Sequence, residues 1–296
     1  MMQKILLIIA IALFSHDAKS QTLNDPININ YSILPKTSFD RVDGNVTTNF
    51  IDVNVTTPDI KVNNKVKVFN AFYYRNSNFD YNSSLPQNNS FPTTLHDIRY
   101  SAIIRMQLNT KWEIVTIPRI MIRSDLSQSF NGNDFFQQVA VFATYVINGN
   151  PNFKIGLGGA LNNDFERNAF VPLGSLYYDS KKVKIEIVYP NANFLYKESE
   201  NFEFGLFASV DGAISRVGPF QLGDDNINYI RTFQLLVAPT ASHRIYKQIF
   251  GHLKLGFAPI RNFEAMNSDF KATQNQDFDL KSSLFFRTGI SFRLKN

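Results

Sequence analysis

Long stretches of this sequence alternate between apolar and polar residues, and this period of two constrains the fold more than any other feature. Within 97–108, Ile98, Tyr100 and Ile104 fall on one face, and mainly charged or polar residues fall on the other. Successive side chains of a β-strand point to opposite faces, so this pattern predicts strands with one apolar face. The same pattern recurs at 152–161, 182–189, 201–211 and 284–294.

The length of these strands distinguishes two kinds of all-β protein. Strands of a soluble β-sandwich also alternate, but soluble strands average about five or six residues, whereas a tilted membrane strand needs about 9–11. The candidate strands run to roughly 10–14 residues, and short connections alternate with long ones. This arrangement is typical of outer-membrane barrels. The sequence therefore predicts a transmembrane antiparallel up-and-down β-barrel, with a secreted sandwich as the alternative.

Turn-forming residues between the alternating segments divide the chain into strands. Short turns include 109–111 and 239–242, and longer connections include 75–96, 216–227 and 261–279. The segments 28–34 and 182–197 are weak, so 12–14 strands are predicted, and a bulge or break is expected at Pro118 and Pro172. The full set of expected strands is 28–34, 45–56, 61–74, 97–108, 111–123, 134–147, 152–163, 169–178, 182–189, 192–197, 201–215, 228–239, 245–260 and 282–295.

The N-terminus has the three parts of a secretory signal peptide. Lys4 supplies the basic region, residues 5–14 form an apolar run, and Ala18 and Ser20 are small residues before a cleavage point at Gln21. Ten apolar residues cover about 15 Å, which is half of a membrane core. We therefore expect residues 1–20 to be a cleaved signal peptide and 21–296 to be the barrel domain, with 21–44 as an N-terminal arm or plug as the alternative.

Composition excludes several classes of function. The chain has no Cys, which excludes disulfides, thiolate metal sites and cysteine nucleophiles. The net charge of +5 is spread without a Lys/Arg run, so no nucleic-acid partner is expected. No catalytic constellation, metal site or cofactor motif is visible. The 28 Phe and 12 Tyr suit a membrane barrel, which gathers aromatic residues at both membrane interfaces.

Several segments together resemble a known family. They are LHDIRYSAIIRMQL at 95–108 and IGLGGALNNDF at 155–165, which leads into FVPLGSLYY at 170–178. In combination they resemble a domain-of-unknown-function family of Gram-negative outer-membrane β-barrel proteins. The resemblance implies a barrel located in the cell outer membrane. It implies no activity and no site residues.

If the apolar faces meet lipid, a set of charged side chains points into the lumen. Seven bases and four acids could make the lumen favour anions, or opposite charges could pair and close it, because buried charge is tolerated only when compensated. The candidate lumen-facing residues are Arg99, Arg105, Glu113, Arg119, Lys154, Lys184, Glu186, Glu203, Asp211, Arg287 and Arg293.

Three functions are compatible with these features. The first is a passive channel that transports or binds a small solute through the charged lumen. The second is a non-conducting structural or interaction barrel that uses the long external loops 75–96 and 261–279. The third is a lipid-modifying enzyme of the outer membrane. The expected partners are outer-membrane lipid, the barrel-assembly machinery during insertion and a small solute.

Overall fold

The computed structural model describes residues 25–40, 43–82, 91–162, 169–222, 225–272 and 278–294, so the predicted signal peptide lies outside the described residues. Within the described residues, no helix is long and apolar enough to cross a membrane. The two 3₁₀ turns are η1 (Gly132–Asp134) and η2 (Ile147–Gly149). The strands are β1 (Ile27–Ser38), β2 (Asn45–Thr56), β3 (Ile60–Lys61), β4 (Val66–Asn82), β5 (Thr94–Gln107), β6 (Trp112–Ser124), β7 (Phe135–Val146), β8 (Phe153–Leu161), β9 (Phe170–Asp179), β10 (Val183–Val188), β11 (Asn191–Lys197), β12 (Phe202–Leu222), β13 (Asp225–Tyr246), β14 (Ile249–Met266) and β15 (Ser283–Phe292).

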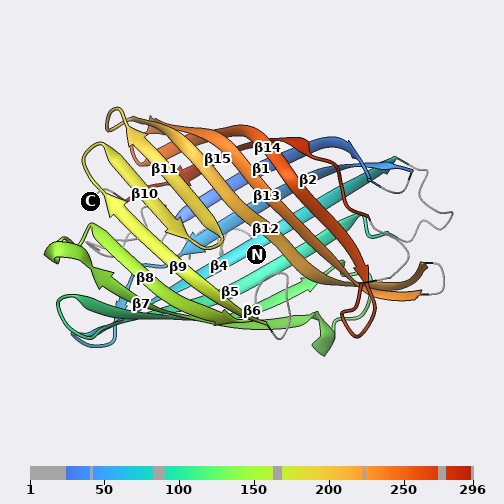
Figure 1. Ribbon diagram of the computed structural model, residues 1–296, viewed down its shortest axis with the longest axis horizontal. Coiled ribbons are helices and arrows are strands. Elements are labelled where there is room, and N and C mark those ends of the chain that lie inside the picture. Colours follow the sequence, from blue (N-terminus) through green and yellow to red (C-terminus); the bar gives the residue numbers. More distant parts are fainter. Residues whose placement is uncertain are drawn as a thin grey trace, which may run out of the picture.

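The strands form one closed ring (Figure 1). Consecutive strands pair in antiparallel fashion, and β1 pairs with β15 from Ile27↔Phe292 to Ile33↔Phe286. Both β2 and the two-residue β3 pair with β4, so the 15 strands occupy fourteen positions in the ring. The predicted up-and-down barrel is confirmed, at the upper end of the predicted strand number. The segment 21–44, for which an arm or plug was the alternative, contributes β1 to the wall.

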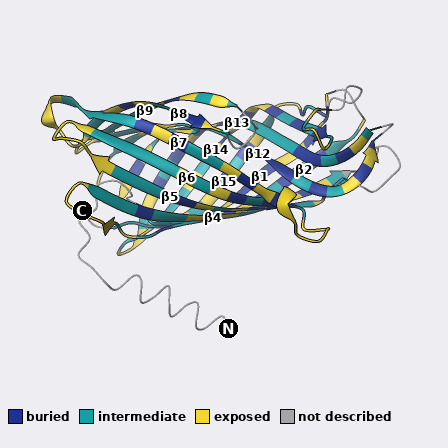
Figure 2. Cartoon of the chain, turned by 90° about the horizontal axis from the view of Figure 1, so that it is seen from below, coloured by how far each residue is buried: buried dark blue, intermediate teal, exposed yellow. Residues whose placement is uncertain are grey.

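The outer surface of the barrel is apolar and carries paired aromatic side chains. Exposed and buried residues alternate along the strands (Figure 2). Near the short turns Trp112 packs against Tyr145, with ring centroids 4.9 Å apart, and farther along the wall Phe72 packs against Tyr100 at 5.1 Å. Such a surface requires an apolar surrounding, and aromatic residues favour its boundaries with water.

The β10–β11 hairpin covers only part of the wall. It turns at the Tyr189–Pro190 bond, and the β11–β12 ladder ends where Asn191 pairs with Ser209. Beyond that point β12 crosses to the end of β6, where Arg216 pairs with Ser124 (Figure 1). The crossing provides partners for a strand edge that would otherwise be unpaired. It also narrows the interior at the end of the long loops.

Prolines inside strands coincide with gaps in the hydrogen-bonded ladders. At Pro118 in β6 and Pro239 in β13, one flanking ladder skips two residue pairs without a change of register. Pro172 in β9 lies beyond Ser175, where the pairing with β10 ends. Proline has no N–H to donate, so it is tolerated where one neighbour makes no bond. Because β6 and β9 continue through Pro118 and Pro172, the bulge or break predicted at each proline is wrong.

Several strands extend farther than the sequence predicted. The turn expected at 239–242 is wrong, because β13 continues to Tyr246. The long connection expected at 216–227 is also wrong, because β12 reaches Leu222 and β13 begins at Asp225. In both places Pro, Gly, Asp and Asn concealed the alternation, and pairing with the neighbouring strand overrode their turn preference.

We expect Leu157→Lys to destabilise the barrel. Leu157 is the middle residue of β8 and is 77% exposed on the outer face. In lipid vesicles the substitution should lower the free energy of unfolding by about 2–4 kcal/mol, because it places a charge in hydrocarbon. Urea titration followed by fluorescence of the single Trp gives the measurement. The control is Leu126→Lys, 51% exposed in the connection after β6. Equal losses for both variants would contradict a lipid-facing outer surface.

Candidate functional site

The inner face of the barrel carries most of the charged side chains. All of the sequence-predicted lumen charges occupy positions that alternate with outward apolar residues along their strands. They do not form one site, because the structure distributes them over a central layer, two cavities near the short turns, and separate positions between these.

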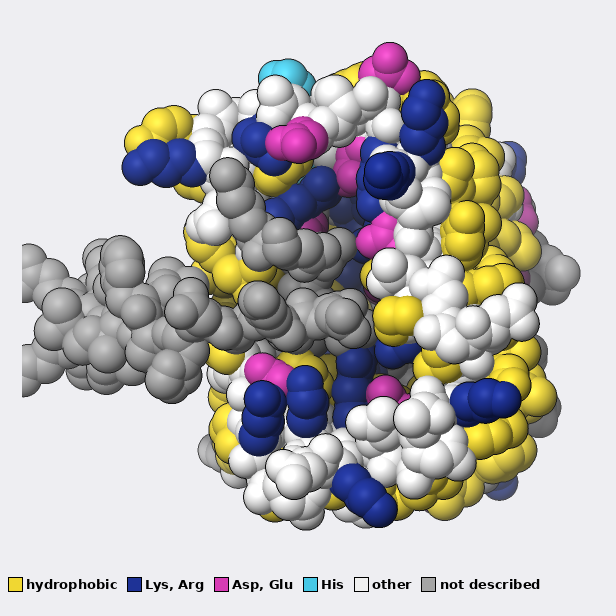
Figure 3. Space-filling model, turned by 90° about the vertical axis from the view of Figure 1, so that its left-hand side faces the viewer, with side chains coloured by type: hydrophobic (Ala, Val, Ile, Leu, Met, Phe, Trp, Pro, Cys, Tyr) yellow, Lys and Arg dark blue, Asp and Glu magenta, His cyan; other side chains and the backbone are white. Residues whose placement is uncertain are grey.

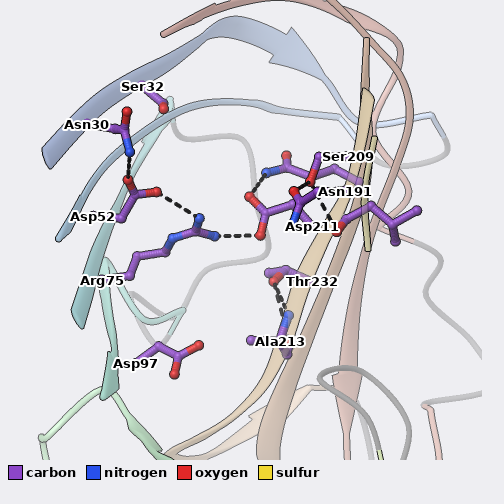
Figure 4. A network of polar contacts seen from close by, with 12 residues as sticks. Asn30, Ser32, Asp52, Arg75, Asp97, Asn191, Ser209, Asp211, Ala213 and Thr232 are labelled. Atoms are coloured by element: carbon purple, nitrogen blue, oxygen red, sulfur yellow. Dashed lines mark hydrogen bonds and ion pairs between the residues drawn. The ribbon is translucent and has the colours of Figure 1, made fainter. Parts of the chain in front are cut away.

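Arg75 of β4 lies at the centre of the lumen between two carboxylates from different strands. Its Nη1 lies 2.6 Å from Oδ1 of Asp211 on β12, and its Nη2 lies 3.1 Å from Oδ1 of Asp52 on β2. Asp52 also accepts a 2.7 Å hydrogen bond from Asn30 Nδ2, and Asn30 Oδ1 lies 2.6 Å from His252 Nε2. Figure 4 shows Arg75 spanning the gap between Asp52 and Asp211. This central layer connects β1, β2, β4, β12 and β14.

A second set of ion pairs lies beside the central layer. Asp97 of β5 accepts hydrogen bonds from Nε and Nη2 of Arg99, and both atoms lie within 3.0 Å of its Oδ2. Arg123 of β6 has no exposed surface, and its Nε lies 3.1 Å from the same oxygen. One carboxylate therefore contacts two arginines that are largely removed from water.

Two further predicted charges are held by neutral partners. Arg287 donates to the Ser32 hydroxyl at 2.8 Å, and its guanidinium lies 5.2 Å from the Phe285 ring centre. Arg119 donates to Ser101 at 2.9 Å and to the Gln138 side-chain oxygen at 3.0 Å. Hydroxyl, amide and aromatic groups therefore contribute to stabilising these cations.

The larger cavity, of about 610 Å³, opens at the short-turn end. Its charges are mostly paired: Lys184 lies 3.0 Å from Glu186, and Arg293 lies 2.6 Å from Glu203 and 3.0 Å from Asp25. Burial raises the pKa of the Asp25 carboxyl, which precedes β1, while Arg293 favours its charged form. Figure 3 shows this end hollowed, with basic and acidic side chains inside and hydrophobic ones around the outside.

The smaller cavity, of about 340 Å³, lies at the same end against β4, β5, β6 and β8. Three of the predicted charges line it, namely Arg105, Glu113 and Lys154. Arg105 Nε is 3.7 Å from Glu113 Oε1, and Lys67 lies 2.9 Å from Asp59. Among the described residues, no carboxylate forms an ion pair with Lys154.

The opposite end of the lumen is filled by apolar side chains, which we call the loop-end plug. Phe91 and Phe278 lie in the connections before β5 and β15, with ring centroids 5.2 Å apart, and Phe39 packs against Phe278 at 5.9 Å. Two cavities bordering this region hold only about 40 and 30 Å³. The plug consists of Phe39, Val46, Phe79, Leu95, Val217, Phe220, Leu222, Ile227, Ile230, Phe263, Ala265, Phe278 and Leu280, with Tyr81 and Phe91 packed against them.

The sequence predicted Asp211 of the central layer but missed Arg75 and Asp52, and it also missed Asp97 beside that layer. Asp52 and Asp97 lie on the polar faces of predicted strands, so the same alternation could have identified them. Arg75 was assigned to a loop because the predicted strand ended at residue 74, whereas β4 continues to Asn82. Extending the alternation of Tyr73 by two residues places Arg75 on the inner face.

The described residues offer little support for metal or acid–base chemistry. Among them, no group of three or more His, Cys, Asp and Glu side chains could hold a metal ion. His252 is engaged by Asn30, and His96 lies 3.1 Å from the Tyr74 hydroxyl, an exposed pair. His252 shares the larger cavity with the hydroxyls of Thr240 and Ser242, and Ser242 is its partner in the β13–β14 ladder.

Comparison with known proteins identifies the family. A family model described as "Domain of unknown function (DUF6268)" matches residues 16–293. The chain belongs to this family. The family resemblance inferred from the sequence is confirmed, and no curated protein matches this DUF6268 chain.

Solved barrels are similar to this DUF6268 chain over nearly its whole length. The COG4313 outer membrane channel from Pseudomonas putida F1 is 12% identical, with a TM-score of 0.44, covering 95% of this chain and 99% of its own. The toluene transporter TodX of P. putida is 8% identical, with a TM-score of 0.39 and coverage of 96% and 92%. The NanC porin is 8% identical, with a TM-score of 0.38 and coverage of 90% and 100%.

We expect Arg75→Gln to be strongly destabilising. It leaves Asp52 and Asp211 without their shared base, and an uncompensated buried charge lowers stability by about 3–5 kcal/mol. Urea unfolding in lipid vesicles measures the loss. The control is Arg231→Gln, which removes a partly exposed pair with Glu264 and should change stability by under about 1 kcal/mol. Adding Asp211→Asn to Arg75→Gln should recover part of the loss. A loss equal to that of the control would show that the central layer is hydrated.

Proposed function

We propose that the chain is a β-barrel of the Gram-negative outer membrane, exported by a cleaved signal peptide and inserted by the barrel-assembly machinery. The closed ring supports this location, because pairing between neighbouring strands satisfies the backbone hydrogen bonds of the wall except where the β10–β11 hairpin ends. The apolar outer face with aromatic pairs supports it as well. In this location outer-membrane lipid covers the band that includes Leu157.

The lumen's function, in this proposal, is to pass a small hydrophilic solute, with the loop end as its gate. The observation that carries the proposal is the contrast between the two ends. Cavities of about 610 and 340 Å³ lined by charged residues open at the short-turn end, whereas the loop end is closed by apolar side chains. Phe91 and Phe278 belong to connections, so they can move without breaking a strand ladder. A gate built this way opens while the wall stays intact.

A non-conducting barrel is the second candidate, and the filled interior favours it. The Arg75 ion pairs cross the lumen, and the plug leaves cavities of only about 40 and 30 Å³ beside it. In that case the long loops meet a partner outside the cell. The enzyme hypothesis has no catalytic arrangement among the described residues to support it.

Removing the two central rings of the plug should open the barrel. In planar bilayers we expect the wild type to conduct rarely and the double variant Phe91→Ala, Phe278→Ala to show larger and longer openings, because the cluster loses its central contact. The matched control is Phe170→Ala, which removes a ring that is 67% exposed on the outer face. Heat-dependent mobility in SDS verifies that each variant is folded. A folded double variant that never conducts would favour the non-conducting barrel.

The charges of the smaller cavity should set ion selectivity. Arg105→Glu exchanges a positive charge for a negative one in that cavity. At about 8 Å in water this two-charge change raises the energy of a monovalent anion by about 1 kcal/mol and lowers that of a cation by about as much. The anion-to-cation permeability ratio should therefore fall roughly thirtyfold. Reversal potentials in a KCl gradient, measured on the plug-opened variant, give this ratio. Lys181→Glu in an exposed turn is the control and should leave it unchanged.

A further inference from the structure

The smaller cavity is built from inner-face residues and from the turns that connect them. Lys67 and Phe69 come from β4, Arg105 from β5, Glu113 from β6 and Lys154 from β8. Its volume of about 340 Å³ corresponds to roughly eleven water molecules at about 30 Å³ each. The cavity is therefore large enough for a small organic ion and some of its hydration.

The charge of this cavity is not balanced. The charged residues of the lining are Lys65, Lys67, Arg105, Lys111, Lys154 and Glu113, which is five bases and one acid. One further acid, Asp59, lies 2.9 Å from Lys67. Five bases thus face two acids, a local excess of three positive charges.

Not every base of the lining has an acid partner. Lys67 lies 2.9 Å from Asp59, and Arg105 Nε lies 3.7 Å from Glu113 Oε1. Lys154 is only partly exposed, and none of the described carboxylates pairs with it. A half-buried ammonium group without a counter-charge is unfavourable unless an anion or water compensates it.

The cavity also has apolar surface in its lining. Phe69 is buried, and its ring lies 5.1 Å from the Arg105 guanidinium carbon, so one wall is apolar. Trp112 and Pro151 contribute further apolar surface at the rim. An apolar wall next to a cluster of bases suits a solute that carries an anionic group on a carbon skeleton.

We propose that this cavity binds a small soluble phosphate-bearing solute, with Lys154 and Arg105 contacting the phosphate. An excess of three positive charges matches a group that carries about two negative charges, and lysines bind phosphate as point charges. Arg105, Glu113 and Lys154 lie on the inner face, so the ligand comes from the aqueous lumen rather than from the lipid. The role of this site in transport rests on the proposed solute function, but the binding itself does not.

Isothermal titration calorimetry with inorganic pyrophosphate tests the site. The folded barrel in neutral detergent at low salt should bind pyrophosphate, and binding should weaken as salt screens the charges. Lys154→Gln should weaken binding by about tenfold, the effect of one charge-assisted hydrogen bond. Glu113→Gln should tighten it, because it removes the acid that competes for Arg105. A misfolded variant cannot produce tighter binding.

The matched control is Lys181→Gln, which removes one exposed positive charge outside the cavity and should leave the affinity unchanged. No binding by the wild type, or equal weakening by Lys181→Gln and Lys154→Gln, would overturn the proposal. Binding of phosphatidylglycerol micelles, with the same dependence on Lys154 and without binding of pyrophosphate, would assign the cavity to a lipid headgroup and also overturn it. The assay needs no conductance, so a barrel that binds but never conducts refutes only the proposed transport.

Discussion

Closure of the ring between β1 and β15 is the constraint on which the rest of the structure depends. In hydrocarbon each unpaired backbone N–H or C=O costs several kcal/mol, so every strand must have two neighbours. The short β10–β11 hairpin does not reach the long-loop end of the wall. There, β9 before Ser175 and β12 beyond Ser209 lose the hairpin as a neighbour. Pro172 lies at the free edge of β9 and has no N–H to satisfy, while β12 crosses to β6. The irregular shape of the barrel is therefore the consequence of one short hairpin.

The same crossing explains why the lumen differs along its length. Where β12 approaches β6 the interior is narrow, and side chains such as Ile214, Met121 and Phe136 pack together as in a soluble core. At the centre the walls are close enough for Arg75 to reach carboxylates on β2 and β12. Toward the short turns the lumen contains cavities, and Lys154 and Arg105 border the smaller one, in which Arg105 faces Glu113. Along the barrel axis, the lumen therefore changes from apolar packing at the loop end, to ion pairs at the centre, to a cavity with excess positive charge near the short turns.

The sequence predicted the wall well because alternation is a local property of each strand. An up-and-down barrel of 12–14 strands in chain order followed from the period of two, which also assigned Arg105 and Lys154 to the inner face. The same period could not predict which inner residues meet, because Arg75 and Asp211 are 136 positions apart and their contact depends on the register of the whole ring. Nor could it predict that Phe91 and Phe278 turn inward, since long connections of a barrel usually face water. The turn predicted at Pro239 was wrong for a different reason. Proline ordinarily ends a strand, but here it lies at a gap in one hydrogen-bonded ladder, so β13 continues through it.

The plug connects the channel hypothesis with the hypothesis of an external partner. Exposing Phe91 and Phe278 to water costs about 2–3 kcal/mol for each ring, or about 5 kcal/mol in all. An opening of that cost is populated at about 2 × 10⁻⁴ without help, which is too rare for efficient transport. A ligand shifts this equilibrium only by its preference for the open form. A molecule that binds the displaced loops prefers the open form directly. A solute in the smaller cavity, at the other end of the barrel, prefers the open form only if its contacts change on opening. Under the proposed function, loop recognition and conduction are therefore two parts of one gating equilibrium.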